Sequence, residues 1–158
     1  MNNIISVFLG GFLAIAGGSV IKWMEFSFER RSLRAAIKAE IASIVDIIAS
    51  RSNRDLFHQA VQSWRDGQDF DLFIFTIDED FTPVYRANVG KVGLLGADVA
   101  GDVVRFYDIL VGARAELRAH INGQTHRMSH QLRADRLESV LSEVESALEL
   151  GKSVVGRM

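Results

Sequence analysis

The spacing of hydrophobic residues along the chain is helical over most of its length. Such residues return every three or four positions, which places them on one face of an α-helix. The positions that follow this spacing are Leu33, Ile37, Ile41, Ile44 and Ile48; Val99, Val103, Phe106, Leu110, Ala113, Leu117 and Ile121; and Leu137, Val140, Val144, Ala147 and Gly151. The first group predicts helix from Lys22 to about Ser50. The other two predict an antiparallel helical hairpin at the C-terminal end of the chain.

Local start and stop signals set the limits of the hairpin's first helix. Asp98 is suited to cap its beginning, and Asn122-Gly123 is suited to end it. The sequence NGQT, which begins at Asn122, is therefore the expected turn between the two long helices.

Two shorter helices are predicted by the same kind of signal. Ser52 to Asp55 has the form of a capping box, and hydrophobic residues follow it at helical spacing until Gly67. Thr82-Pro83 is a second helix start, with Thr as the N-cap and Pro at the first helical position. Glycines at 90, 93 and 96 indicate that this second helix is short.

The stretch from Phe70 to Phe81 departs from the helical pattern, because aromatic and aliphatic residues alternate irregularly with acidic ones. It is either a strand or an irregular segment that lies on the helices. We expect the irregular segment, since no partner strand is evident and a lone strand is unstable. Asp78, Glu79 and Asp80 are interpreted as a solvated acidic turn, because neighbouring residues of an extended chain point to different sides and do not surround a metal ion.

The N-terminal run from Ile4 to Ile21 has 18 residues, no charge and no proline. A cleaved signal peptide normally has a basic start and a shorter apolar run, and a helix of a soluble core normally has a polar face. A helix of this length spans about 27 Å, close to the ~30 Å hydrocarbon core of a bilayer. The pattern therefore predicts a transmembrane anchor over residues 1–24, followed by a helical domain over residues 25–158.

The orientation of this anchor follows from the charges beside it. Five cations lie soon after the run, at Lys22, Arg30, Arg31, Arg34 and Lys38, whereas the residues before it carry none. The positive-inside rule then places the N-terminus in the periplasm and the helical domain in the cytoplasm. Lys22, Trp23, Arg30, Arg31 and Arg34 are the residues expected at the lipid headgroups.

Small residues repeat every fourth position in the apolar run, at Gly10, Ala14 and Gly18. Such a stripe allows two membrane helices to approach closely. The alternative is that glycine is simply common in membrane helices. We treat the stripe as a candidate membrane-helix contact.

Composition narrows the picture further. The chain has 158 residues, one proline and no cysteine, so disulfides and thiolate metal sites are excluded. Its net charge is −2, which gives no electrostatic reason to expect nucleic acid as a partner. The expected fold class is all-α.

We find no motif of an enzyme, a nucleotide site or a metal site. His126 and His130 are four residues apart and would share a helix face, but no third ligand is evident, so a structural or exposed role is favoured. Neither a phosphate-binding loop nor a nucleophile elbow occurs. We expect no catalytic residue and no cofactor.

One segment resembles a recurring pattern in small, single-span bacterial membrane proteins of unassigned function. The matching residues are Tyr85, Ala87, Asn88, Lys91, Gly93, Leu94, Leu95, Phe106 and Tyr107. The resemblance implies an N-terminal span but no activity. Tyr85, Asn88 and Lys91 are candidates for residues that hold two helices together or face a partner.

Two functions fit these expectations. The first is a membrane-anchored interaction or scaffold protein at the bacterial inner membrane, without catalytic activity. The second is a small accessory subunit of a larger membrane complex. Both require a protein partner, which is either a second copy of the chain or a larger assembly.

Overall fold

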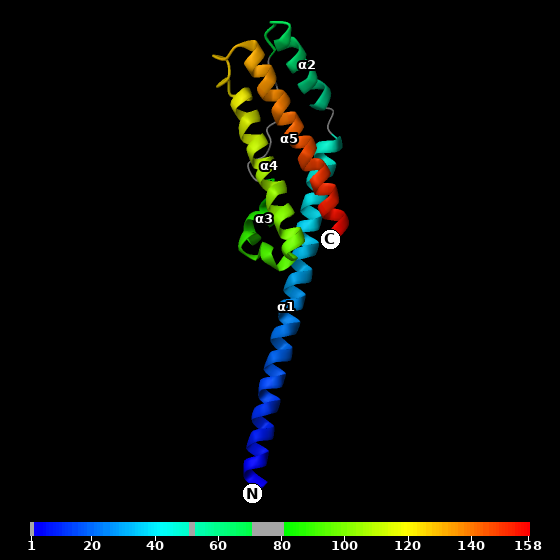
Figure 1. Ribbon diagram of the computed structural model, residues 1–158, viewed down its shortest axis with the longest axis vertical. Helices are drawn as coiled ribbons and strands as arrows, with labels where there is room; N and C mark the ends of the chain where they lie inside the picture. Colours follow the sequence, from blue (N-terminus) through cyan, green and yellow to red (C-terminus); the bar gives the residue numbers. More distant parts are fainter. Residues whose placement is uncertain (1, 51–52, 71–80) are drawn as a thin grey trace.

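The computed structural model describes the backbone of residues 2–50, 53–70 and 81–158, and the side chains of residues 18–49, 55–70 and 81–158. Within these ranges the regular elements are all helical, which confirms the predicted all-α class. The elements are α1 (Asn2–Ser50), α2 (Asn53–Arg65), α3 (Pro83–Asn88), the 3₁₀-helix η1 (Val89–Leu95), α4 (Ala97–Ile121) and α5 (His130–Arg157). The N-terminal half of α1 projects away from a bundle formed by the other helices and its own C-terminal half (Figure 1).

The predicted C-terminal hairpin is present. Helices α4 and α5 run antiparallel along the bundle, and the turn between them lies at the end far from the N-terminus (Figure 1). Helix α4 ends at Ile121, and Gly123 follows with a φ of 71°, as predicted from Asn122-Gly123. Ser129 caps α5, because its hydroxyl accepts a hydrogen bond from the backbone N–H of Leu132.

Of the predicted helix caps, that of α4 is wrong, and that of α3 lies at Thr82 as predicted but lacks a side-chain hydrogen bond. Gly96, with a φ of 97°, precedes α4, and Asp98 lies within the first turn rather than before it. Helix α3 begins at Pro83 as predicted, but the side chain of Thr82 makes no capping hydrogen bond. The donors at the start of α3 are satisfied by a residue from another helix, Glu40, described below.

The buried hydrophobic residues in the described part of the bundle form two clusters. The proximal core, nearer the projecting part of α1, consists of Leu33, Ile37, Ile41, Ile44, Val45, Val92, Leu95, Val99, Val103, Phe106, Tyr107, Leu110, Ala147 and Val154. The distal core, nearer the α4–α5 turn, consists of Ala60, Val61, Trp64, Ala113, Leu117, Ala134, Leu137 and Val140. Most of the positions predicted from the helical spacing are buried in one of them, although Ile121 is exposed.

Gly151 marks the closest approach between helices in the proximal core. A Cβ atom at this position would lie 2.7 Å from a ring carbon of Phe106 on α4 and 2.8 Å from a methyl of Val45 on α1. Only glycine lets the three helices meet there without displacing a neighbour. The position was predicted to face the core from its spacing, and this is confirmed.

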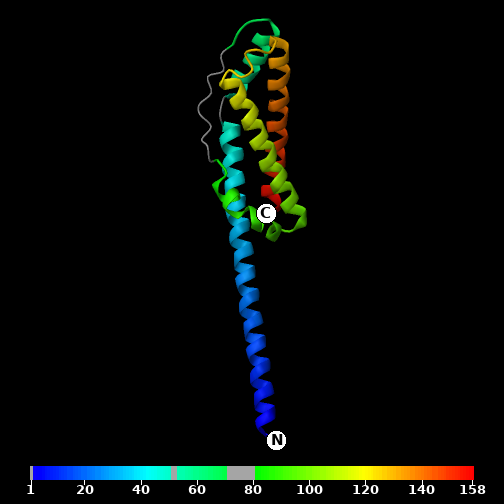
Figure 2. The ribbon, with the colours of Figure 1, turned by 90° about the vertical axis from the view of Figure 1, so that its left-hand side faces the viewer.

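The interpretation of the stretch from Phe70 to Phe81 is largely untested, because residues 71–80 lie outside the described part of the chain. The two ends of the stretch are described. Phe70 packs against the distal core and Phe81 against the proximal core, each partly buried. Figure 2 shows the C-terminal half of α1 alongside α4 and α5 in the bundle.

Candidate interaction surfaces

Large apolar side chains are exposed where α1 leaves the bundle. Six of them lie within nine residues: Val20, Ile21, Trp23, Met24, Phe26 and Phe28. Trp23 and Phe28 are 70% and 75% exposed. Such a group of exposed apolar side chains is unusual on the surface of a soluble protein.

The residues expected at lipid headgroups divide into two groups. Lys22, Trp23, Arg30 and Arg31 are exposed on the projecting part of α1. Arg34 is only partly exposed, and its guanidinium donates a hydrogen bond of 2.6 Å to the backbone carbonyl of Arg157. Arg34 therefore joins α1 to the end of α5 and lies at the edge of the bundle.

The candidate membrane-helix contact is described only in part. Gly10 and Ala14 lie on the continuous helix α1, but side chains before residue 18 are outside the described part of the chain. Gly18 is exposed, and a Cβ there would meet no atom within 4 Å. In the part of the chain that the structure describes, no helix is long and apolar enough to cross a membrane.

The carboxylate of Glu40, on α1, is the centre of a polar cluster in the proximal core. It accepts hydrogen bonds from the backbone N–H groups of Val84 and Tyr85, at 2.7 and 3.0 Å. It also accepts one of 2.6 Å from the hydroxyl of Tyr107 on α4. Glu40 thus caps α3 and ties both α3 and α4 to α1.

Tyr85 completes this cluster by stacking on Tyr107, with ring centroids 3.9 Å apart. Burial raises the pKa of Tyr107 above its usual 10.0, and the hydrogen bond to Glu40 and its charge act in the same direction. Burial also raises the pKa of Tyr85, with a further contribution from the charge of Asp108. Both phenols are therefore neutral at physiological pH.

The other two candidate residues near α3 also make contacts within the chain. The amide of Asn88 donates a hydrogen bond of 2.8 Å to the carbonyl of Val84, so it closes its own helix rather than reaching another. The ammonium of Lys91, on η1, lies 2.6 Å from a carboxylate oxygen of Glu29 on α1. Both members of this pair are about half exposed, and such pairs contribute little to stability.

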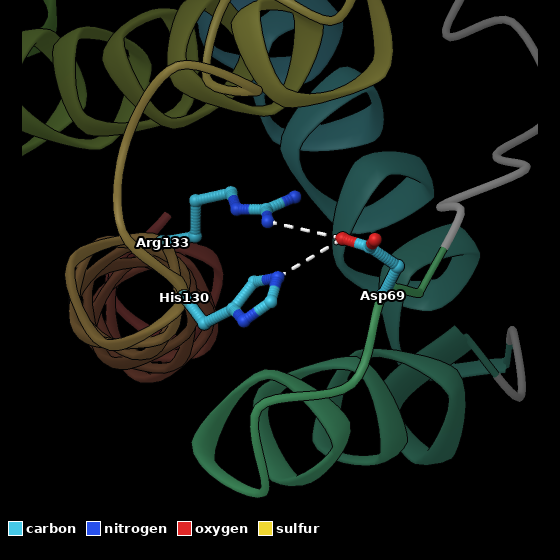
Figure 3. A network of polar contacts seen from close by, with 3 residues as sticks. All are labelled: Asp69, His130 and Arg133. Atoms are coloured by element: carbon cyan, nitrogen blue, oxygen red, sulfur yellow. Dashed lines mark hydrogen bonds and ion pairs between the residues drawn. The ribbon is translucent and has the colours of Figure 1, made fainter.

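A second polar cluster lies at the distal end of the bundle. Asp69, which follows α2, accepts a hydrogen bond of 3.2 Å from the guanidinium of Arg133, and its carboxylate lies 3.0 Å from Nε2 of His130 (Figure 3). Both partners lie on the first turn of α5. The bonds from His130 and Arg133 hold the pKa of the Asp69 carboxyl below its usual 3.8.

Arg133 and Trp64 extend this cluster into the distal core. The Arg133 guanidinium lies over the Trp64 ring, 5.3 Å from its centroid, although the Arg133 side chain is only 7% exposed. The Trp64 ring also stacks on the ring of His120, on α4, with ring centroids 5.8 Å apart. Three polar atoms in this group are buried without a hydrogen-bond partner among the described residues: Trp64 Nε1, His120 Nε2 and Arg133 Nε.

The histidine pair considered from the sequence does not share a helix face. His126 is exposed in the turn beside Gly123, whereas His130 is the first residue of α5 and contacts Asp69. In the part of the chain that the structure describes, no group of three His, Asp or Glu side chains is placed to hold a metal ion.

Neither Glu40 nor the distal cluster was predicted from the sequence. Glu40 lies between Ile37 and Ile41, which are both buried. An acidic residue beside the hydrophobic face of a helix was the feature of the sequence that could have identified it. Asp69 lies 61 and 64 residues before its partners His130 and Arg133, and nothing in the local pattern pairs them.

Comparison with protein-family models, with curated proteins and with solved structures finds no match for this chain. The resemblance of Tyr85 and the residues after it to a family of single-span proteins therefore stays a prediction.

Proposed function

We propose that this chain is a membrane-anchored helical interaction protein without catalytic activity, held at the bacterial inner membrane by residues 1–24. Its N-terminus is periplasmic and its helical domain, residues 25–158, is cytoplasmic. The observation that carries the proposal is the exposure of apolar side chains from Val20 to Phe28. They continue the uncharged run from Ile4 to Ile21 on the same helix, α1.

The composition of this exposed segment fits a bilayer boundary. Trp23 and Phe26 are aromatic, and Lys22, Arg30 and Arg31 are cationic and exposed. Aromatic rings favour the headgroup region, and cations next to anionic lipid are stabilised by about 1 kcal/mol each. A protein partner offers no equally simple reason for apolar, aromatic and cationic residues in this order along a single helix.

The bundle itself supports a binding role rather than a chemical one. The polar residues of its two clusters make contacts within the chain: Glu40 caps α3, Tyr85 stacks on Tyr107, and Asp69 joins α2 to α5. The Tyr107 hydroxyl lies 2.6 Å from the Glu40 carboxylate, but the Tyr107 side chain is fully buried and so is not open to a substrate. The domain is therefore a packed helical bundle whose surface binds a protein partner at the membrane.

Membrane insertion is tested by introducing a charge in the middle of the apolar run. Ile15→Arg should release a large part of the full chain from the membrane fraction after alkaline carbonate extraction, because a central arginine costs about 2.5–3.5 kcal/mol on insertion scales. Val104→Arg is the matched control, since Val104 is an exposed apolar residue of the bundle. A variant at position 15 that is retained like the control would contradict the anchor.

Orientation and partnership need separate measurements. A reporter fused after Met158 should be active only in its cytoplasmic form. Recovery of the full chain in a mild detergent, followed by mass identification, then separates self-assembly from capture by a larger membrane complex. Only the second result would favour the accessory-subunit alternative.

A further inference from the structure

Among the described helices, the backbone of α2 lies close to that of α5 alone, whereas α5 also lies close to α1 and α4. Helix α2 reaches α4 through side chains, such as Trp64, which stacks on His120. Helix α2 has 13 residues, a length that is marginal for a helix without tertiary support. Its buried hydrophobic residues are Ala60, Val61 and Trp64, and Phe57 packs partly buried on the distal core, so two large side chains provide most of its apolar anchorage.

The polar groups beneath α2 oppose its docking. Trp64, His120 and Arg133 are each less than 10% exposed, and each has one polar atom without a hydrogen-bond partner among the described residues. A buried donor or acceptor left in this way loses its hydration and gains nothing in return. Separation of α2 from the hairpin returns these atoms to water and recovers that loss.

The polar contacts that hold α2 from outside are exposed to solvent. The guanidinium of Arg65 lies 2.6 Å from a carboxylate oxygen of Glu138, and both side chains are about half exposed. The side chain of Asp69, whose carboxylate contacts His130 and Arg133, is 85% exposed. Exposed ion pairs of this kind are weak, so these contacts position α2 without preventing its release.

From these three observations we infer that α2 and the residues up to Asp69 form an arm that opens from the α4–α5 hairpin, while the proximal core stays packed. The contact of Asp69 with His130 and Arg133 is the latch of this arm. Opening exposes Trp64 together with Leu117, Leu137 and Val140, which it covers in the distal core. The inference concerns the bundle alone and does not depend on the membrane anchor.

The test is hydrogen exchange measured by mass spectrometry on the full chain in a mild detergent. Amides of α2 from Leu56 to Trp64 should exchange at least about tenfold faster than those of α4 from Val103 to Leu117, because they open without global unfolding. Asp69→Asn should accelerate amide exchange in α2 by a further two- to fivefold or so and leave the exchange rates in α4 unchanged. Asp135→Asn is the matched control, since Asp135 contacts Gln131 of its own helix, and it should change neither.

A crosslink provides the converse measurement. The chain has no cysteine, so a double variant, Arg65→Cys with Glu138→Cys, can be joined by a short bismaleimide without side reactions at other thiols. Joining should slow α2 exchange toward the rate of α4. The inference would be overturned if α2 and α4 exchanged at equal rates in the unmodified chain. It would also be overturned if Asp69→Asn left the exchange rate of α2 unchanged, or if the crosslink did not slow it.

Discussion

The hydroxyl of Tyr107 donates a hydrogen bond of 2.6 Å to the carboxylate of Glu40, which joins the middle of α4 to the C-terminal half of α1. The same carboxylate caps α3 through two backbone N–H groups. One acidic residue thus fixes three helices relative to one another. Because the cluster is partly buried, each of its bonds is protected from competition by water.

Tyr107→Phe removes one of these bonds and leaves the ring in place. The free energy of unfolding should fall by about 1–3 kcal/mol, the range for a hydrogen bond to a charged group. Urea unfolding of the full chain in detergent, followed by circular dichroism, measures the change. Tyr85→Phe keeps the stacked rings and Glu40's three bonds, so a comparable loss in that control would show that the hydroxyl of Tyr107 has no special role.

Gly151→Ala should destabilise the bundle by about 1–3 kcal/mol, because the new methyl group would overlap Phe106 and Val45. Thermal unfolding measures the effect. Gly112→Ala is the control within α4, where a Cβ meets no atom within 4 Å. That variant should be neutral or more stable by about 0.5–1 kcal/mol, because alanine favours helix. Equal effects at the two positions would contradict the close packing at Gly151.

Alkaline titration tests the two phenols, which are the only tyrosines of the chain. Both have a pKa raised above 10.0 in the folded state. The stabilisation from neutral Tyr85 and Tyr107 is therefore complete below pH 10.0 and is lost as pH rises toward their folded pKa values. Tyrosinate absorbance should stay low at pH 10 in the folded chain and appear on unfolding in urea. A normal titration of both residues in the folded chain would contradict their burial.

The Asp69 carboxyl has the opposite pH dependence. Its folded pKa lies below 3.8 because of His130 and Arg133, so its contribution to the latch is complete above pH 3.8 and is lost as pH falls through the folded value. Carboxyl chemical shifts measured by NMR against pH should show this depressed pKa. Arg133→Met should raise it toward 3.8. An unshifted Asp69 in the unmodified chain would indicate that the pair does not persist in solution.

The small-residue stripe gives a prediction for the anchor. Leucine at positions 10, 14 and 18 together would separate backbones that approach closely, while the apolar length needed for insertion is kept. Crosslinking in membranes should then show weaker association without loss of membrane retention. Leucine at Phe8 and Phe12 is the control. If the two sets of variants associate equally, the small residues do not form a helix contact and only reflect the composition of the run.

The helical pattern predicted the long elements well because hydrophobic spacing is a local property. Leu33, Ile37, Val103 and Phe106 are buried where their spacing placed them. Helix caps were less predictable, because a distant residue replaced a local one: Glu40 caps α3 although Thr82 directly precedes it. The distal cluster was not predictable at all, since Asp69 and Arg133 meet only when α2 docks on α5.

Helix α1 contains neither glycine nor proline between Lys22 and Ser50, and it is continuous from the projecting part into the proximal core. A helix without such residues has no natural point at which to bend. The part of α1 from Ile21 to Ser50 is about 45 Å long at 1.5 Å per residue. A tilt or rotation of its N-terminal end would therefore be passed along one continuous helix to Ile37 and Ile41 in the proximal core.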